Sequence, residues 1–206
     1  MRNLKGLVAA AATSAAVLGL LAAPSASAAD APKDHGQRVT SIAGLKLTPV
    51  NVPGARKDAR TASNEDPQPY LIQSVANGFC LDADTGSINE NGTPISLWGC
   101  DAYARNQWFY VSVDADGYFY FRNGASNRYL EADLDQIDEN GTKVQLWDFN
   151  GWDNQKWAAS QDEQGQKVIE NGWSGRVLDA DGNHLYEPGT PVQLWDFWGG
   201  ENQLWF

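Results

Sequence analysis

Apolar and polar residues alternate in short runs from residue 70 to the end of the chain. The runs KVQLW (143–147) and PVQLW (191–195) place an apolar side chain at every second position, and each run follows a Gly-Thr pair. A period of two predicts β-strands, and no stretch of this segment shows the 3.6-residue period of an amphipathic helix. The segment is therefore expected to be all-β.

The alternating pattern belongs to an internal repeat. Three windows of 31 residues, at 79–109, 128–158 and 176–206, align without a gap, and nine positions are identical in all three. A sequence repeat at this spacing indicates supersecondary units that pack against one another. Each unit contains four predicted strands, which makes twelve in all. The units span about residues 70–112, 117–160 and 165–206.

Units of four short strands are too small for each to bury a core of its own. They have to share one core in a closed arrangement, because the edges of their sheets would otherwise stay unpaired. A closed threefold sheet of this kind is a β-trefoil. A propeller of three blades is the alternative, but propellers typically have four to eight blades. We therefore predict a β-trefoil over residues 70–206.

Alternation also assigns the side chains of each unit to two faces. In PVQLW the Val and Leu share the core face, so Gln193 and Trp195 lie on the outer face. The same pattern places Trp98 and Trp147 outside. An outer indole either offers a stacking platform to a ligand or packs against the loop that follows, and the spacing does not decide between these two roles. The tryptophans near the end of each window are expected to fill the shared core: Trp108, Trp157 and Trp205.

The N-terminus has the layout of a cleaved secretory signal. MRNLK carries positive charge, an uncharged apolar run follows, and small residues precede a cleavage site after Ala28. A membrane anchor is the alternative, but the apolar run is near the short limit for spanning and the small-residue site follows at once. No later stretch is long and apolar enough to cross a bilayer. We expect residues 1–28 to be a signal peptide and the protein to be secreted without membrane insertion. Residues 29–69 predict a polar, mostly flexible leader, although SIAGLKLTPVNV (41–52) has strand character and could pair onto the domain.

The chain has two cysteines, Cys80 and Cys100. In an oxidising compartment they can form a disulfide, and closing a loop of about 20 residues would stabilise the fold by about 3 kcal/mol. Two free, buried thiols are the alternative. Two cysteines cannot make a zinc site, and neither has a partner at ligand spacing, so no metal is expected there.

Charge is unevenly distributed along the chain. Residues 70–206 contain seven Lys and Arg against 21 Asp and Glu, a net charge of −14, whereas residues 29–69 have a net charge of +1. An acidic domain repels phosphate backbones and anionic surfaces. Nucleic acid is therefore not an expected partner, and sialylated or sulfated ligands are disfavoured relative to neutral ones.

Polar side chains gather beside the outer tryptophans. One carboxylate per unit follows the first core leucine, and two units have an Asn-Gln pair just before the last tryptophan and its spacer. A carboxylate accepts hydrogen bonds from adjacent hydroxyls, amides donate and accept, and an indole packs on the C–H face of a sugar. These groups predict a carbohydrate pocket. The aspartates two residues after the carboxylates are expected to cap turns instead: Asp84, Asp133 and Asp181.

The motifs L-D/E-A-D, G-T-x-V-x-L-W and N-Q-x-W resemble those of the ricin B-chain lectins, also called R-type lectins or family 13 carbohydrate-binding modules, of the secreted bacterial type. The resemblance covers about residues 70–206, and its Gln-x-Trp signature is specific to that family. It implies a β-trefoil with up to three sugar pockets, usually for galactose-like or xylan-type sugars. It also implies a disulfide between Cys80 and Cys100 within the first unit.

The resemblance assigns sugar-binding roles unit by unit. The third unit fills every position, with a carboxylate, an amide, an aromatic residue and a late polar pair at Asp179, Gln193, Trp195, Asn202 and Gln203. The second unit has a glutamate at the carboxylate position, which shifts the acceptor by about one methylene. Its members are Glu131, Gln145, Trp147, Asn154 and Gln155.

The first unit departs most from the pattern of the family. Asp82 and Trp98 match, but Ser96 replaces the glutamine. When Trp108 is used as the anchor, Arg105 and Asn106 fall where the Asn-Gln pair is expected. This pocket therefore has the least complete set of groups.

No catalytic set is evident. His35 lies in the leader and His184 in a loop, and neither a G-x-S-x-G nor an H-E-x-x-H motif occurs. The Asp-x-Asp segments lack the spacing of a calcium loop. We expect a non-catalytic, monomeric lectin with no cofactor and no metal. The alternative is a protein-binding trefoil such as a secreted protease inhibitor, which would use the loop residues Trp152, Tyr186 and Trp198.

Overall fold

The computed structural model of the protein describes residues 36–51 and 68–206. The predicted signal peptide (1–28) and the leader residues 29–35 and 52–67 lie outside the described residues. The strands are β1 (Gln37–Val39), β2 (Thr48–Pro49), β3 (Pro69–Leu71), β4 (Cys80–Ala83), β5 (Thr93–Trp98), β6 (Phe109–Val113), β7 (Phe119–Asn123), β8 (Tyr129–Ala132), β9 (Thr142–Trp147), β10 (Trp157–Gln161), β11 (Lys167–Asn171), β12 (Val177–Ala180) and β13 (Thr190–Trp195). The helices are α1 (Ile42–Leu45) and the 3-10 turns η1 (Arg105–Gln107), η2 (Leu134–Gln136), η3 (Asp153–Gln155) and η4 (Glu201–Gln203).

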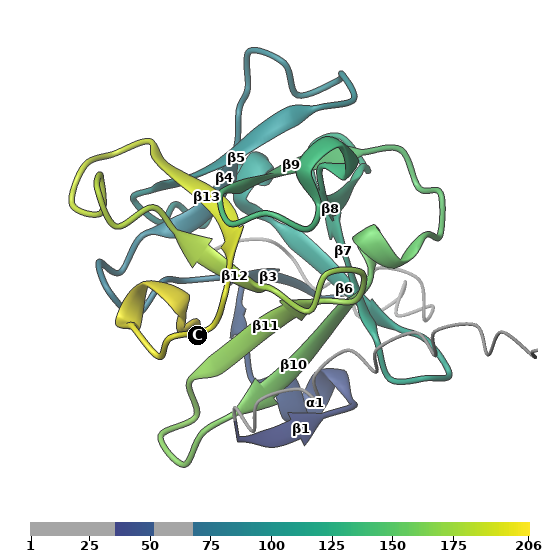
Figure 1. The fold of residues 1–206 in the computed structure, drawn as a ribbon. Coiled ribbons are helices and arrows are strands. Elements are labelled where there is room, and N and C mark those ends of the chain that lie inside the picture. The colour runs from purple at the N-terminus through teal and green to yellow at the C-terminus, as the bar shows by residue number, and fades with distance from the viewer. Residues whose placement is uncertain (1–35, 52–67) are drawn as a thin grey trace, which may run out of the picture. The chain divides into compact units, whose positions relative to one another are not determined.

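Each unit contributes one hairpin, and the three hairpins pair with one another in a ring (Figure 1). The hairpins are β4–β5, β8–β9 and β12–β13. Their second strands pair antiparallel across the unit boundaries, so every unit contacts both others. The cross-unit partners include Thr93–Leu146, Thr142–Leu194 and Thr190–Leu97.

The repeated Gly-Thr pair starts the second strand of every hairpin. Its glycines have φ between 90° and 93°, a left-handed conformation that favours glycine. The hydroxyl of Thr190 donates to the carbonyl oxygens of His184 and Glu187, each at 2.8 Å, and so closes the loop before the strand. The other two threonines bond the equivalent carbonyls. The aspartates predicted to cap turns do so, because Asp84, Asp133 and Asp181 each accept a backbone N–H two residues ahead.

The remaining strands form a second closed ring. β3 pairs with β6, and β6, β7, β10 and β11 follow as antiparallel neighbours. Trp205 closes the gap, because its backbone bridges to Lys167 at the start of β11 and to Ser74 beyond β3. The predicted twelfth strand is thus a single bridge at Trp205. The closed threefold sheet is a β-trefoil, as predicted.

The predicted faces of the hairpins are confirmed. The core-facing apolar residues are at most 3% exposed, and the outer tryptophans Trp98, Trp147 and Trp195 are 47%, 37% and 38% exposed. The buried side chains of all three units pack in one cluster, which is the shared core that short units require. The core-facing residues are Ile95, Leu97, Val144, Leu146, Val192 and Leu194.

The prediction for Trp108 is wrong. Trp157 and Trp205 are fully buried in the core, and each donates its ring N–H to a backbone carbonyl at 3.1 Å. In the first unit Phe109 fills this position, whereas Trp108 is only partly buried and packs beside the disulfide. The loop after Trp98 is one residue longer than in the other units. The gapless alignment therefore matched the residue that precedes the core aromatic.

Residues 36–51 fold onto the trefoil, which corrects the prediction of a mostly flexible leader for this part. β1 pairs with β10, β2 pairs with β3, and α1 lies between them in the chain (Figure 1). Leu45 and Leu47 are 0% and 5% exposed and belong to the main core. The short apolar alternation of this segment is sufficient for order because the sheet supplies strand partners on both sides.

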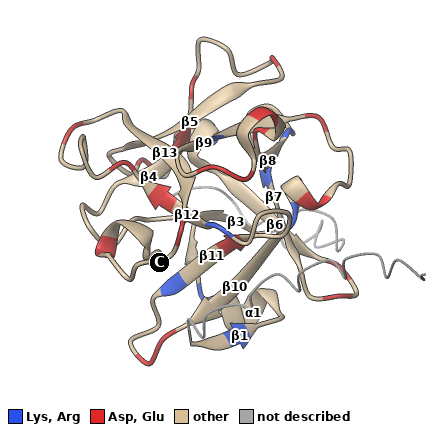
Figure 2. Cartoon of the chain, viewed as in Figure 1, with Lys and Arg blue, Asp and Glu red and all other residues tan. Residues whose placement is uncertain are grey.

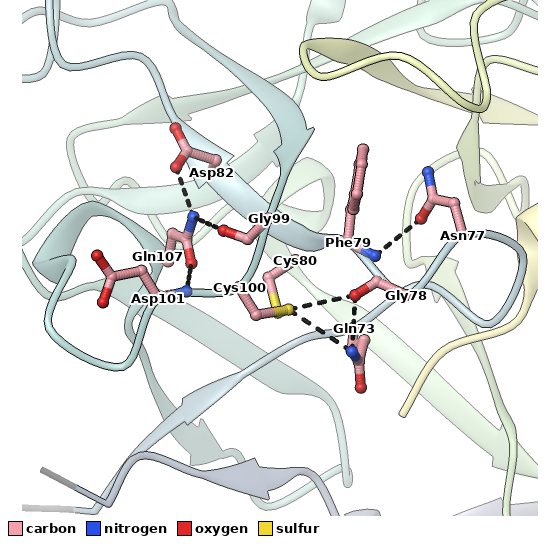
Figure 3. The surroundings of a disulfide bond; sticks show 10 residues. All are labelled: Gln73, Asn77, Gly78, Phe79, Cys80, Asp82, Gly99, Cys100, Asp101 and Gln107. Carbon is pink, nitrogen blue, oxygen red and sulfur yellow. Dashed lines mark hydrogen bonds between the residues drawn. A yellow bond between two sulfur atoms is a disulfide. The ribbon is translucent and has the colours of Figure 1, made fainter.

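Cys80 and Cys100 form a disulfide, which confirms the predicted pairing and excludes the free thiols (Figure 3). The bond joins β4 to the loop after β5, across a Cα–Cα distance of 5.0 Å and a separation of 20 residues. Cys80 is fully buried and packs with Val50, Leu71 and Trp108 in a second, smaller apolar cluster. The disulfide therefore fixes the loop of the first unit to its hairpin.

Acidic side chains lie mainly in the loops and turns, and few Lys or Arg accompany them (Figure 2). This distribution fits the net charge of −14 over residues 70–206. Over the described ranges, no helix has the length and apolar character needed to span a membrane.

Candidate functional site

The hairpins bring the predicted polar groups together on their outer face. In each unit the carboxylate on the first strand lies directly opposite the amide or hydroxyl on the second. The Asn-Gln pair comes from a 3-10 turn (η1, η3 or η4) that packs against the first strand. The cross-strand partners are Asp82–Ser96, Glu131–Gln145 and Asp179–Gln193.

In the second unit, Glu131 is almost fully buried and accepts three amide hydrogen bonds. Gln145 Nε2 donates to Oε1 at 3.1 Å, while Asn154 Nδ2 and Gln155 Nε2 donate to Oε2 at 3.3 and 3.0 Å. Asn154 also donates to the carbonyl of Ala132 at 3.0 Å. The structure thus brings the four predicted polar groups of this pocket together, and the longer glutamate reaches all three amides.

In the third unit, Asp179 occupies the same position and is 2% exposed. Gln193 Nε2 donates to Oδ1 at 3.1 Å, and Asn202 Nδ2 donates to Oδ2 at 2.9 Å. Burial raises the pKa of Asp179 to about 6, although the amides of Gln193, Gln203 and Asn202 oppose the shift by stabilising the ionised form. Burial also raises the pKa of the Glu131 and Asp82 carboxyls.

In the first unit the amide pair is Asn106 and Gln107, which corrects the assignment to Arg105 and Asn106. Asn106 Nδ2 donates to Asp82 Oδ1 at 2.9 Å. Gln107 Nε2 donates to Asp82 Oδ2, also at 2.9 Å (Figure 3). The longer loop shifts the register, and the Asn-Gln pair common to all units would have identified Gln107. Since Ser96 replaces the glutamine, Asp82 receives no amide from β5 and is less buried than its counterparts.

The outer tryptophans pack against the Gly-Thr turn of a neighbouring unit. A Cβ placed on Gly92 would lie 3.8 Å from the ring of Trp147, and one placed on Gly141 would lie 4.0 Å from the ring of Trp195. Trp98 meets Gly189 in the same way, at 3.7 Å. Each outer tryptophan therefore has a neighbour's turn as a packing partner, and the three residues remain 37–47% exposed.

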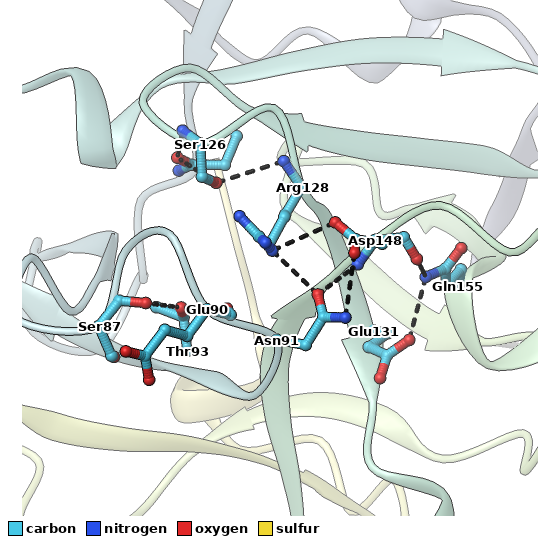
Figure 4. A network of polar contacts seen from close by, with 10 residues as sticks. Ser87, Glu90, Asn91, Thr93, Ser126, Arg128, Glu131, Asp148 and Gln155 are labelled. Atoms are coloured by element: carbon cyan, nitrogen blue, oxygen red, sulfur yellow. Dashed lines mark hydrogen bonds and ion pairs between the residues drawn. The ribbon is translucent and has the colours of Figure 1, made fainter.

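Polar clamps hold two of these neighbouring turns in place. Asn91, from the turn of the first unit, accepts from Arg128 Nε at 2.9 Å and donates to Asp148 at 3.1 Å (Figure 4). Arg128 and Asp148 also form an ion pair at 3.3 Å. Asn140, Arg176 and Asp196 repeat the clamp between the second and third units. At the third boundary Pro188 stands at the equivalent position, and its side chain has no hydrogen-bonding group.

Two hollows lie over these groups. The hollow of the second unit, about 530 Å³, has Glu131 and Gln145 among its lining residues together with Trp147 and the loop residues Asn150 and Trp152. The hollow of the first unit, about 420 Å³, is lined by Asp82, Ser96 and Trp98 together with Gly189 and Pro191 of the third unit. Both volumes are typical of small-ligand sites. Each hollow offers acceptor oxygens beside an exposed aromatic ring.

The hydrogen-bonding groups offer no metal-binding or nucleophilic arrangement in the described part of the chain. Residues 36–51 and 68–206 contain no group of three or more His, Cys, Asp or Glu side chains that could hold a metal ion. His184, the histidine of these ranges, pairs with Asp181 at 2.8 Å in an exposed loop. The carboxylates, amides and exposed indoles described above are groups that can bind a polyhydroxylated ligand by hydrogen bonds and stacking.

Fold and site together define a β-trefoil whose units each present a carboxylate, amides and an exposed indole. The family model of the ricin-type beta-trefoil lectin domain matches residues 68–205. The chain belongs to this family, as its repeated motifs predicted. A search of curated proteins gives no match.

Solved structures agree with this fold. The designed threefold-symmetric protein ThreeFoil is 24% identical with a TM-score of 0.62, covering 66% of this chain and 95% of that one. A Macrolepiota procera ricin B-like lectin in complex with lactose is 24% identical with a TM-score of 0.57, covering 68% and 94%. An exo-β-1,3-galactanase from Clostridium thermocellum is 28% identical with a TM-score of 0.63, but the match covers 68% of this chain and only 30% of the enzyme. Family membership and the lectin neighbours support carbohydrate binding.

Proposed function

We propose that the protein is a secreted, non-catalytic lectin that binds neutral sugars through up to three pockets, one per unit. The observation that carries this proposal is the threefold recurrence of one arrangement. Asp82, Glu131 and Asp179 are each held by amides on the outer face of a hairpin that also carries an exposed indole. Core packing explains neither the exposed tryptophans nor the recurrence of an amide-bonded carboxylate in each unit, buried in the second and third.

Charge supports neutral ligands such as galactose- or xylan-type glycans. The pockets lie on a domain with a net charge of −14, and their floors are carboxylates, so an anionic ligand would be repelled. The same field supports the proposal that nucleic acid is not a partner. Secretion is supported by the N-terminal sequence and by the disulfide between Cys80 and Cys100, which is typical of an oxidising compartment.

The proposal of a non-catalytic, monomeric protein rests on the chemistry of the described groups. The pocket carboxylates Glu131 and Asp179 each accept two or more amide hydrogen bonds, which holds them as acceptors for the hydroxyl groups of a ligand. The galactanase neighbour matches over only 30% of its length, so its catalytic activity is not extended to this chain.

A glycan array with the full secreted chain tests the proposal. Trp98→Ala, Trp147→Ala and Trp195→Ala remove one exposed platform each, and we expect the triple variant to lose binding while it stays folded by circular dichroism. These variants are easier to interpret than Asp179→Ala. Removing that buried carboxylate would leave the donors of Gln193 and Asn202 without a partner and destabilise the fold. An array on which the wild type binds no glycan, or on which the triple variant binds as the wild type does, contradicts the lectin function.

A protein-binding trefoil such as a protease inhibitor is the alternative. It would use the exposed loop residues Trp152, Tyr186 and Trp198, which are 55%, 79% and 67% exposed. Trp152, however, lines the hollow over Glu131, so exposure alone does not place it in a separate interface. Retained protease inhibition in the triple platform variant would favour this alternative.

A further inference from the structure

A second indole lines the hollow of the second unit. Trp147 from β9 and Trp152 from the following loop are both among its lining residues, and Trp152 is 55% exposed. Trp152 was not part of the predicted pocket, because the third unit has Gly200 at the equivalent position. The hollow therefore has aromatic surface from two separate segments.

The loop that carries Trp152 is held by the same amide that binds the floor of the pocket. Gln155 Nε2 donates to Glu131, while Gln155 Oε1 accepts from the backbone N–H groups of Asn150 and Gly151 at 3.0 and 3.3 Å. Asn150 Oδ1 in turn accepts from the backbone N–H of Trp152 at 2.8 Å. The backbone that carries the second indole is thus held relative to the carboxylate.

The third unit places an indole at the equivalent position from a different residue. Gly200 precedes η4 as Trp152 precedes η3, and the ring of Trp198 covers it, since a Cβ added to Gly200 would lie 2.1 Å from Trp198 Cη2. Gln203 Oε1 accepts from the backbone N–H groups of Trp198 and Gly199, as Gln155 does in the second unit. The second and third units therefore each have a further tryptophan in this loop, at different positions: Trp152 and Trp198.

The first unit has a different wall. Its hollow is lined opposite the carboxylate by Thr85, Pro94 and Pro191, and no aromatic residue of the loop after β5 is among its lining residues. Trp98 is the indole of that pocket. The hollow of the first unit therefore has one indole among its lining residues, and that of the second unit has two.

We propose that Trp152 and Trp198 are second stacking residues, so that the pockets of the second and third units select pyranose rings whose substituents are all equatorial. This inference rests on the proposed sugar binding. An all-equatorial ring has axial C–H bonds on both faces and can contact an indole with each. An axial hydroxyl, as at C4 of a galacto-configured ring, would lie against one indole without a hydrogen-bond partner, which disfavours it.

The test compares two sugars that differ only at C4, methyl β-D-glucopyranoside and methyl β-D-galactopyranoside. Both are titrated by calorimetry or NMR into the full chain with Trp98→Ala, which removes the platform of the first unit. We expect this protein to prefer the glucoside. Adding Trp152→Ala and Trp198→Ala should weaken glucoside binding about two- to tenfold and remove the preference, as expected for the loss of one aromatic contact per pocket. Trp152→Phe and Trp198→Phe should restore part of it.

Trp173→Ala is the matched control. Trp173 is 50% exposed on the turn between β11 and β12 and is not among the residues that line either hollow, so its removal should not change affinity. Unchanged glucoside affinity after loss of Trp152 and Trp198, or a wild-type preference for the galactoside, would contradict the proposed stacking role of these two residues. The lectin function would remain intact. If neither the wild type nor the Trp98→Ala protein binds any glycan, the lectin function itself fails, and this inference with it.

Discussion

Burial of Asp179 should make the stability of the domain depend on pH. The carboxyl is 2% exposed, and burial raises its pKa from 3.8 to about 6. A carboxyl with a raised folded-state pKa binds its proton more tightly in the folded protein than in the unfolded chain. Its contribution therefore stabilises the fold at low pH and is lost as the pH rises through 6.

The size of the effect follows from the two pKa values. Between pH 5 and pH 7.5 the folded carboxyl passes from largely protonated to ionised, while the unfolded one stays ionised, so the contribution falls by about 1.4 kcal/mol. Asp179→Asn removes this titration. The substitution also places an NH₂ group against the donors of Gln193 or Asn202, so the variant should be less stable at every pH, and the informative quantity is the pH dependence of the difference.

Urea unfolding at pH 5, 6 and 7.5, followed by tryptophan fluorescence, measures this difference. The free energy of unfolding of the wild type should exceed that of Asp179→Asn by about 1.4 kcal/mol more at pH 5 than at pH 7.5. The carboxyls of Glu131 and Asp82, whose pKa values are also raised, titrate in both proteins, so their contributions cancel in the difference. Glu163→Gln, at an exposed turn between β10 and β11, is the control and should follow the wild type. A difference that is the same at both pH values would refute the reasoning.

Three further predictions concern stability. Replacing Cys80 and Cys100 by serine should lower the free energy of unfolding by about 3 kcal/mol in urea titrations, and a smaller loss than about 1 kcal/mol would contradict the loop-closure estimate. Leu45→Ala should cost about 2–5 kcal/mol, because this leucine is fully buried in the core; an unchanged midpoint would show that residues 36–51 add nothing to it. Deleting Gln203–Phe206 should unfold the domain, since Trp205 closes the ring of strands, and a truncated chain with wild-type melting would argue against closure.

The architecture could be predicted from the sequence because it repeats three times. Alternation placed Val192 and Leu194 inside and Trp195 outside, and the same pattern in the other units required a shared core. The alignment of Trp108 with Trp157 and Trp205 predicted the wrong core residue. A single extra residue in the preceding loop was enough to move that indole out of the core and to let Phe109 replace it.

Other features depended on contacts between distant segments. Residues 36–51 have only a few apolar positions, and their order depends on pairing with β10 and β3, which no local pattern specifies. The predicted polar groups of each pocket share one unit, so spacing could bring Asp179, Gln193 and Asn202 together. Trp152 belongs to no repeated position, because the third unit has Gly200 there, so the repeat did not assign Trp152 to the hollow that it lines.

The contact between each outer tryptophan and a neighbour's glycine means that the repeat in the sequence is not the functional module. Trp195 belongs to the proposed pocket of the third unit, but its ring packs on Gly141 of the second unit. The same relation joins Trp147 to Gly92 and Trp98 to Gly189. A single repeat excised from the chain would lack the turn on which its outer tryptophan packs. Each proposed pocket thus depends on contacts between two neighbouring units, and all three contacts form only when the ring of hairpins closes.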